Sequence, residues 1–262
     1  MNKKLLMEKV KKGFILYIIV LILSYYIQSN FGTILLANVS GIGLFWAVIG
    51  TIYALIVAFV MVEVWGQFNV FGESIGKESQ TIITLWNFTD YLDNLDVSRS
   101  MQDALAGYID SVAGKEWSDL AKTVRVSQTS PSLSKIREVI NMIPVKGERS
   151  AIAFSSIISA YENLLDARGR RIESGLHRLP PMVRALFFMI SGLFAFGYMI
   201  IGFDNMILYL ATLSALFAIV VLVYNIIFDM DVPFEGIFNV DSEALTLAKG
   251  YILKTKHRKS ST

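Results

Sequence analysis

The sequence predicts an all-α membrane protein with four transmembrane helices and a helical cytoplasmic domain inserted between the second and the third. Two observations indicate this fold class. Of the 262 residues, 54% are hydrophobic, and Lys and Arg are absent from two long stretches, 13–76 and 185–248. One helical crossing takes about 20 residues, so each stretch has room for a pair of spans. No strand-like alternation of apolar and polar residues persists along the chain.

We expect the four spans near residues 14–28, 43–65, 184–203 and 206–228. The first apolar stretch has the length of a signal peptide, but no small-residue cleavage site follows it, so we expect a retained helix. The predicted division of the chain is an N-terminal tail with the first pair of spans (1–65), a cytoplasmic helical domain (66–182), the second pair of spans (183–229) and a cytoplasmic C-terminal tail (230–262).

The distribution of the 24 basic residues predicts the orientation in the membrane. Five of them lie within 3–12, fourteen within 77–184 and five within 249–259. Because cytoplasmic segments of membrane proteins carry an excess of Lys and Arg, all three segments are expected on the cytoplasmic side. The two outer connections contain a single charge, Asp204. We therefore predict a multi-pass protein of a prokaryotic cell membrane with both termini in the cytoplasm.

The central block has the pattern of helices. Apolar residues recur at helical spacing from Ile75 to Leu92 and again from Met101 to Val112. Ser130 followed by a proline is typical of a helix start, because the serine side chain caps free backbone N–H groups and the proline ring suits the first helical position. We also expect a helix over about 148–173.

Several functional classes are excluded by composition. The chain has no cysteine, which excludes disulfides and thiolate metal sites, and its two histidines are too few for an ordinary zinc site. We find no catalytic motif of a metalloprotease, a serine hydrolase or a dinucleotide-binding enzyme. A formal charge of +2 is too small to indicate a nucleic-acid partner. The sequence thus predicts no enzyme and no resident cofactor.

Glu63 is the one acidic residue well within a predicted span. At about 1.5 Å per residue it lies about 30 Å along the helix from Gly43, at the inner edge of the membrane. Two interpretations stay open: a carboxylate that reaches water beside Trp65, or a ring of carboxylates at the mouth of a pore. The spans contain no relay of buried ionisable groups, so we do not expect active transport.

The second span has one face of small side chains and, roughly opposite, a face of large side chains. A stripe of small residues allows the backbones of neighbouring helices to approach closely. Large apolar residues that symmetry arranges in a ring form a constriction that excludes water. The bulky face is therefore a candidate pore lining, or else a flank in contact with lipid. The small stripe comprises Gly43, Ala47, Gly50, Ala54 and Ala58, and the bulky face comprises Phe45, Ile52, Ile56, Phe59 and Glu63.

Three segments resemble the bestrophin-like membrane proteins, prokaryotic relatives of the bestrophin channels. The second span ends in FVMVEVWGQF (59–68), the Arg-rich RRIESGLHRLPPMVRALFF (170–188) leads through prolines into the third span, and DMDVPFEGIFNVD (229–241) follows the fourth. Together with the pattern of four spans and a large helical insertion, the resemblance covers nearly the whole chain.

This resemblance implies a pentameric, passive ion channel in which the second helix of each subunit lines a central pore. Bestrophins mostly conduct anions, and some bacterial relatives conduct cations. We expect chloride and other anions to be slightly favoured, because the basic central block would raise their local concentration, whereas a Glu63 ring would favour cations. A gapless alignment on WGQF brings Ala47, Thr51 and Leu55 to the neck of the family's pore, which is an alternative pore-lining face. The alternative function is a non-conducting scaffold or sensor whose cytoplasmic helices bind a protein partner.

The acidic segment after the fourth span is a candidate metal site. Asp229 and Asp231 could supply oxygen ligands to Ca²⁺. The other interpretation is pairing with Arg170, Arg171 or Arg178, because the family resemblance brings these segments together. The expected partners are membrane lipid, copies of the same chain and inorganic ions, with no nucleic acid.

Overall fold

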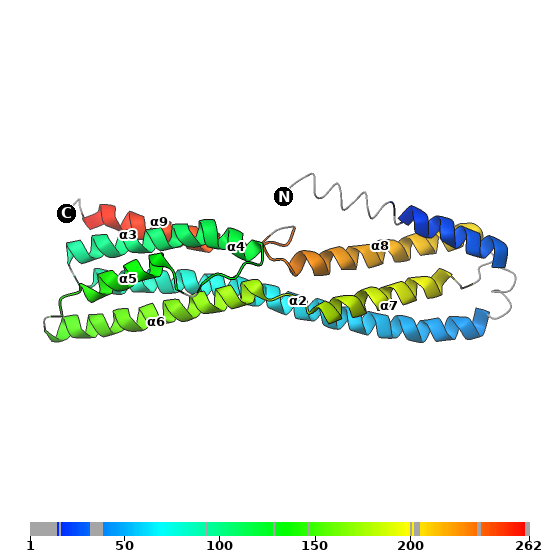
Figure 1. Ribbon diagram of the computed structural model, residues 1–262, viewed down its shortest axis with the longest axis horizontal. Coiled ribbons are helices and arrows are strands. Elements are labelled where there is room, and N and C mark those ends of the chain that lie inside the picture. The colour runs from blue at the N-terminus through cyan, green and yellow to red at the C-terminus, as the bar shows by residue number, and fades with distance from the viewer. Residues whose placement is uncertain are drawn as a thin grey trace. The chain divides into compact units, whose positions relative to one another are not determined.

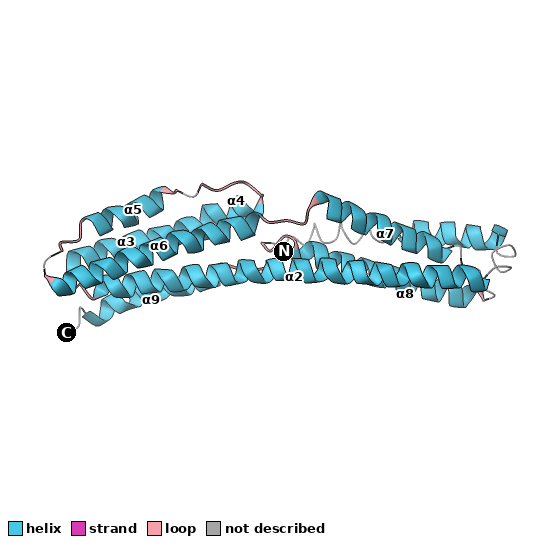
Figure 2. Cartoon of the chain, turned by 90° about the horizontal axis from the view of Figure 1, so that it is seen from below, coloured by secondary structure: helices cyan, strands magenta, loops and turns pink. Residues whose placement is uncertain are grey.

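The computed structural model describes residues 15, 17–31, 39–92, 94–127, 129–145, 147–199, 201, 205–234 and 237–259. Within these residues every regular element is a helix and none is a strand (Figure 2), which confirms the all-α prediction. The N-terminal tail and Asp204 lie outside the described residues. In chain order, the helices are Tyr17–Phe31, α2 (Val39–Asp90), α3 (Leu95–Ser111), the π-helix η1 (Val112–Glu116), α4 (Trp117–Ala121), α5 (Pro131–Asn141), α6 (Glu148–Leu176), α7 (Pro181–Met199), α8 (Met206–Met230) and α9 (Glu243–Lys259) (Figure 1).

Three described helical stretches are long and apolar enough to cross a membrane: Gly43–Asp90, Ser150–Met199 and Met206–Met230. The second of these contains α6 and α7, and its apolar part is α7. A further apolar helix, Tyr17–Phe31, is shorter than the other three. Each of the four segments overlaps one predicted span, but Gly43–Asp90 and Ser150–Met199 extend well beyond the predicted bounds of 43–65 and 184–203. That all four cross a membrane stays a prediction.

The chain divides into two compact units. Unit 1 comprises residues 1–66, 178–231 and 235–238, and unit 2 comprises residues 67–177, 232–234 and 239–262. The long helix α2 supplies residues to both. Unit 1 therefore contains the apolar helices, and unit 2 contains the helices of the predicted central domain together with α9.

Buried polar contacts join the helices of unit 1. The hydroxyls of Tyr17 and Ser214 lie 2.7 Å apart, and the hydroxyl of Ser24 is hydrogen-bonded to that of Tyr209. One turn further along, the Gln28 side chain donates to the carbonyl of Ile201 at 2.7 Å. In lipid such bonds between helices contribute about 1 kcal/mol each. They fix the helix Tyr17–Phe31 against α8 and the end of α7.

Aromatic side chains pack against glycines between α2 and α7. The ring of Tyr53 stacks on that of Phe194 with 4.9 Å between the centroids. A Cβ atom added at Gly50 would lie 2.9 Å from the Phe194 ring, and one added at Gly197 would collide with the Trp46 ring. Both glycines are therefore required for the close approach of these two helices.

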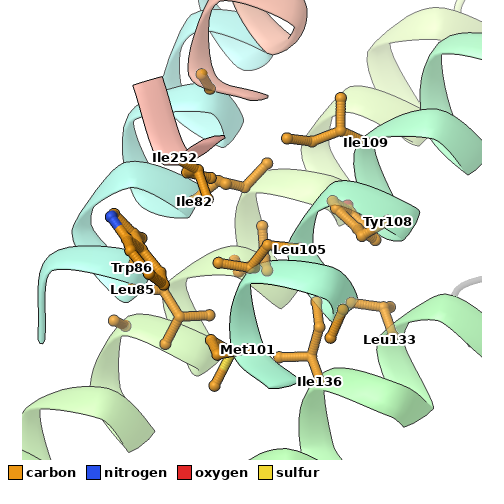
Figure 3. Close-up of a cluster of buried hydrophobic side chains, with 14 of the residues drawn as sticks. Ile82, Leu85, Trp86, Met101, Leu105, Tyr108, Ile109, Leu133, Ile136 and Ile252 are labelled. Atoms are coloured by element: carbon orange, nitrogen blue, oxygen red, sulfur yellow. The ribbon is translucent and has the colours of Figure 1, made fainter. Parts of the chain in front are cut away.

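The core of unit 2 is a single apolar cluster built from α2, α3, α5, α6 and α9. In Figure 3 the side chains of Leu85, Leu105, Met101 and Ile136 point toward one another. All four are fully buried. Burying one such side chain contributes about 1.5–3 kcal/mol. The apolar residues that recur at helical spacing in the sequence thus form the inner face of this bundle.

The start of α5 agrees with the sequence prediction. The Ser130 hydroxyl accepts a hydrogen bond from the N–H of Leu133 at 3.3 Å, and Pro131 is the first helical residue. The helix α6 begins at Glu148 as expected and extends to Leu176, three residues beyond the predicted end.

The segment predicted as a C-terminal tail contains the helix α9, which packs in unit 2. The Lys249 ammonium donates to Asp110 of α3 at 2.6 Å, and the carbonyl of Ile252 accepts from the side chain of Gln102 at 2.8 Å. Ile252 and Leu245 are fully buried. The basic residues after Lys249 give this segment the composition of a solvated tail, which conceals its apolar stripe.

A cluster of four charged side chains lies buried in unit 2. Arg171 donates to Glu78 of α2 and, at 3.0 Å, to Glu116 at the end of the π-helix. Arg168 donates to the same Glu116 oxygen at 2.5 Å. The hydroxyl of Tyr108 donates to the second oxygen of Glu78. Two guanidinium groups thus balance two carboxylates where almost no water reaches them.

The environment of the cluster raises the pKa values of both Tyr108 and Arg171. Burial raises the pKa of the Tyr108 hydroxyl, and the negative charge of Glu78 raises it further, so this side chain stays protonated as a donor. Burial lowers the pKa of Arg171, but Glu78 and Glu116 outweigh that effect and leave it above its ordinary value. Tyr108 thus stays a neutral donor, and Arg171 keeps its positive charge.

Removing one member of the buried cluster should lower the free energy of unfolding far more than removing a surface charge does. In Arg171→Met, Glu78 loses its guanidinium partner in the interior, and breaking such a buried pair costs about 3–5 kcal/mol. Lys249→Met breaks a more exposed pair and should cost about 0–1 kcal/mol. Unfolding of the full chain in detergent, followed by circular dichroism, measures both. Equal losses of stability would contradict the importance of the buried cluster.

Two glycines of α7 offer a matched test of the packing on α2. Gly197→Ala places a methyl group against the Trp46 ring and should destabilise the protein by about 1–3 kcal/mol. A methyl at the exposed Gly192 meets nothing within 4 Å, and Gly192→Ala should be neutral or stabilising, because alanine favours the helix by about 1 kcal/mol. Thermal unfolding midpoints compare the two variants. A Gly197→Ala protein as stable as Gly192→Ala would refute this packing.

Candidate functional site

The rotation of α2 about its own axis is fixed within unit 1 by one buried face. Tyr53, Val60 and Val64 are buried, and they recur at helical spacing. Trp46 extends the same face toward the start of the helix and contacts α7. Among the described residues of unit 1, the side chains on the opposite side of α2 are largely exposed.

The bulky face of α2 lies beside this packed face and is largely uncovered. Phe59 is 74% exposed and Ile52 is 43% exposed, while Ile56 is half-buried. At about 100° per residue, Ile52 and Phe59 lie about 100° to 120° from Tyr53 around the helix. Large apolar side chains that their own subunit leaves uncovered need either lipid or another copy of the chain around them.

Glu63 continues the bulky face, one turn after Phe59. Its side chain is exposed, as is that of the neighbouring Trp65. From Ile52 to Glu63 the helix rises about 16 Å. The face therefore changes over this length from large apolar side chains to a carboxylate.

The alternative face from the family alignment is also uncovered. Ala47, Thr51 and Leu55 are all exposed. The Thr51 hydroxyl donates to the carbonyl of Ala47 at 3.0 Å, so it needs no partner from another helix. This face lies on the far side of α2 from Tyr53. Packing within the subunit thus leaves both candidate faces available, and the choice between them stays open.

Within the small-residue stripe, Gly50 packs against α7, whereas the three alanines do not. Gly50 is approached by the Phe194 ring, but Ala47, Ala54 and Ala58 are exposed. Aromatic side chains on the adjacent face, including Tyr53, form most of the contact with α7. These three alanines are therefore available to meet another helix or lipid.

The two candidate calcium ligands have partners within unit 1. One oxygen of the buried Asp231 accepts from the N–H of Leu179 at 2.7 Å, and the other accepts from Arg184 at 2.7 Å. One oxygen of Asp229 accepts from the N–H groups of Ile237 and Phe238 at 2.7 and 2.8 Å. Both carboxylates thus hold the chain where it leaves α8.

The arginine in the Asp231 ion pair differs from those expected. Arg171 pairs with Glu78 and Glu116 in unit 2, and the partner of Asp231 is Arg184, in the first turn of α7. The signal for Arg184 was its place at the end of the Arg-rich segment, three residues after the first helical proline. Among the described residues no group of three or more His, Cys, Asp or Glu side chains could hold a metal ion. A calcium site at Asp229 and Asp231 stays a prediction.

Comparison with known proteins decides the family. The model of the bestrophin-like domain matches residues 14–245. The chain belongs to the bestrophin-like family. A search of curated proteins finds no match.

Solved structures of bacterial bestrophins have the same fold. One variant of a bestrophin homologue from Klebsiella pneumoniae matches with a TM-score of 0.72 at 10% identity, covering 95% of this chain and 99% of that one. A structure described only as a membrane protein matches with a TM-score of 0.72 at 12% identity, over 94% of this chain and 98% of the other. At such low identity these matches show the bestrophin-like fold alone.

Calcium titration tests the predicted metal site. A site at Asp229 and Asp231 predicts that millimolar Ca²⁺ raises the thermal unfolding midpoint of the purified protein, because a ligand stabilises the state that binds it. The double variant Asp229→Asn/Asp231→Asn should lose the rise. Mg²⁺ at the same concentration is the control, since it dehydrates reluctantly and favours other sites. No rise with Ca²⁺ in the unmodified protein would contradict the site.

Proposed function

We propose that this protein is a passive ion channel of a prokaryotic cell membrane, formed by several copies of the chain, most simply five, around a central axis. The observation that carries the proposal is the exposed bulky face of α2, on which Phe59 is 74% exposed although the adjacent face is buried. Membership of the bestrophin-like family supports the same function, because bestrophins are channels and not enzymes.

In this proposal four helices cross the membrane: Tyr17–Phe31, the first part of α2, α7 and α8. The domain of residues 66–182 and the C-terminal segment lie in the cytoplasm. The segregation of the basic residues supports this orientation. The same arrangement places Glu63 at the cytoplasmic end of the crossing.

The proposed pore wall is the bulky face of α2. Around a symmetry axis, copies of Ile52, Ile56 and Phe59 approach one another and exclude water, which makes a narrow apolar constriction. Copies of Glu63 form a ring of carboxylates at its inner mouth. The face with Ala47, Thr51 and Leu55 is the alternative wall.

Two charge distributions act on ion selectivity in opposite directions. The block 77–184 has 14 basic and 13 acidic residues, an excess of one, which slightly raises the local concentration of anions such as chloride. A Glu63 ring favours cations at the throat. We propose a slight preference for anions, and reversal potentials under a salt gradient measure it.

Truncation of the proposed constriction should increase ion flux. Phe59→Ala and Ile56→Ala widen an apolar neck, so ion efflux from reconstituted vesicles should rise severalfold. Leu222→Ala, an exposed position on α8, is the control for loss of a lipid-facing side chain and should leave flux unchanged. If Leu55→Ala alters flux while Phe59→Ala does not, the alternative face lines the pore. A protein without flux in any form would favour the scaffold or sensor function.

Cysteine labelling tests the topology, because the chain has no cysteine of its own. With an impermeant thiol reagent, Asn30→Cys should react on intact cells. Ser130→Cys should react only after the membrane is opened. Asn30 is exposed in the last turn of the first proposed span, and Ser130 lies outside the proposed spans, so neither substitution should disturb packing in lipid. Labelling of Ser130→Cys from outside would overturn the proposed orientation.

A further inference from the structure

The two uncovered faces of α2 can be followed along the same helix into unit 2. α2 is one uninterrupted helix of 52 residues, so positions along it are related by helical register. A side chain returns to the same side of an α-helix after about 18 residues, which make about five turns. By this count Lys77 lies on the line of Phe59, and Glu73 lies on the line of Leu55. Each candidate pore face therefore leads to one charged residue of unit 2.

This side of α2 is polar in unit 2 and is left uncovered by its own subunit. The opposite side of the helix contributes to the apolar core. The uncovered positions recur every three or four residues, which is the repeat by which helices follow a shared axis. Helices in close contact along such a repeat have apolar residues on it, so charged residues favour a space filled with water. The uncovered positions are Val70, Glu73, Lys77 and Gln80.

The Lys77 ammonium is an unpaired charge on this surface. Its side chain is exposed. Among the described residues it forms no ion pair, and the basic residues of unit 2 that do so are Arg168, Arg171 and Lys249. Removing the charge of Lys77 therefore breaks no described ion pair within the subunit. An effect of that removal on ion flux would report on the charge itself.

In the proposed channel, copies of Lys77 surround the approach to the pore from the cytoplasm. A ring of ammonium groups raises the local concentration of anions and repels cations. Lys77 follows Glu63 by about 21 Å of helix rise. This distance exceeds the Debye length of about 8 Å at physiological salt, so the two rings act on ions separately. The Lys77 ring thus opposes the preference for cations that a Glu63 ring gives to the throat.

We propose that Lys77 determines ion selectivity, by attracting anions to the cytoplasmic approach of the pore. The proposal rests on the proposed channel function and on the bulky face of α2 as the pore wall. It assigns the slight preference for anions to one side chain at a defined place on α2, in addition to the small basic excess of the whole domain.

Reversal potentials of the full chain in planar bilayers under a salt gradient test the role of Lys77. Lys77→Gln should lower the ratio of anion to cation permeability about threefold, because an uncovered charge on the ion path is lost. Lys77→Arg keeps the charge and should keep the ratio. Lys135→Gln is the matched control, since Lys135 is exposed on α5, which lies across the bundle of unit 2 from α2 (Figure 2). A ratio unchanged in Lys77→Gln would overturn the proposal.

Glu73 distinguishes between the two lines of α2. If the line of Phe59 and Lys77 faces the ions, Glu73 lies to one side of it, about 40° around the helix. Glu73→Gln should then raise the permeability ratio by a smaller factor than Lys77→Gln lowers it. A larger effect of Glu73→Gln than of Lys77→Gln would overturn the role of Lys77 and favour the face of Leu55.

The salt dependence separates an effect of charge from a change of fold. The Debye length falls from about 8 Å at 0.15 M salt to about 3 Å at 1 M, so the difference between Lys77→Gln and the unmodified protein should largely disappear at 1 M. A difference that persists would overturn the electrostatic role. The two proposals fail separately. Absence of current from the unmodified protein would remove the channel and this role with it, whereas current with the same selectivity in Lys77→Gln would remove the role of Lys77 alone.

Discussion

The packing of α2 against α7 is the contact on which the functional account depends. Trp46 and Tyr53 lie on one face of α2; Gly197 of α7 gives Trp46 the space to approach, and Tyr53 stacks on Phe194. A helix held along one face has a fixed rotation. This rotation decides that Phe59 and Glu63 point away from their own subunit, and that Ala47 and Leu55 do so on the other side. A surface of α2 for ions or for another copy of the chain must therefore be one of these uncovered faces.

The charged side chains are arranged differently in the two units. In unit 1 the described helices carry few charges, and Asp231 and Arg184 stand together at their end. In unit 2 two arginines and two glutamates are buried as one balanced cluster that includes Glu78 of α2. A buried charge is tolerated only when it is paired and hydrogen-bonded. The balanced cluster of unit 2 is consequently structural, and the pair of Arg184 and Asp231 holds the start of α7 to the end of α8.

The sequence predicted the helices better than it predicted contacts between residues far apart in the chain. Ser130 and the following proline located the start of α5, because capping depends on neighbouring residues alone. Apolar spacing located the buried faces of α2 and α3 for the same reason. The pairing of Arg171 with Glu78, 93 residues away, depends on how α6 returns along α2, and no local signal contains it. The pore-lining face also could not be decided, since it depends on contacts between copies of the chain.

The number and arrangement of subunits test the central claim most directly. Single-particle imaging of the purified protein in lipid nanodiscs shows both. The account predicts a closed ring of identical subunits with α2 of each nearest the axis and with Phe59 or Leu55 directed toward it. A monomer, or a dimer without a central axis, would contradict the proposal that α2 forms the wall of a channel.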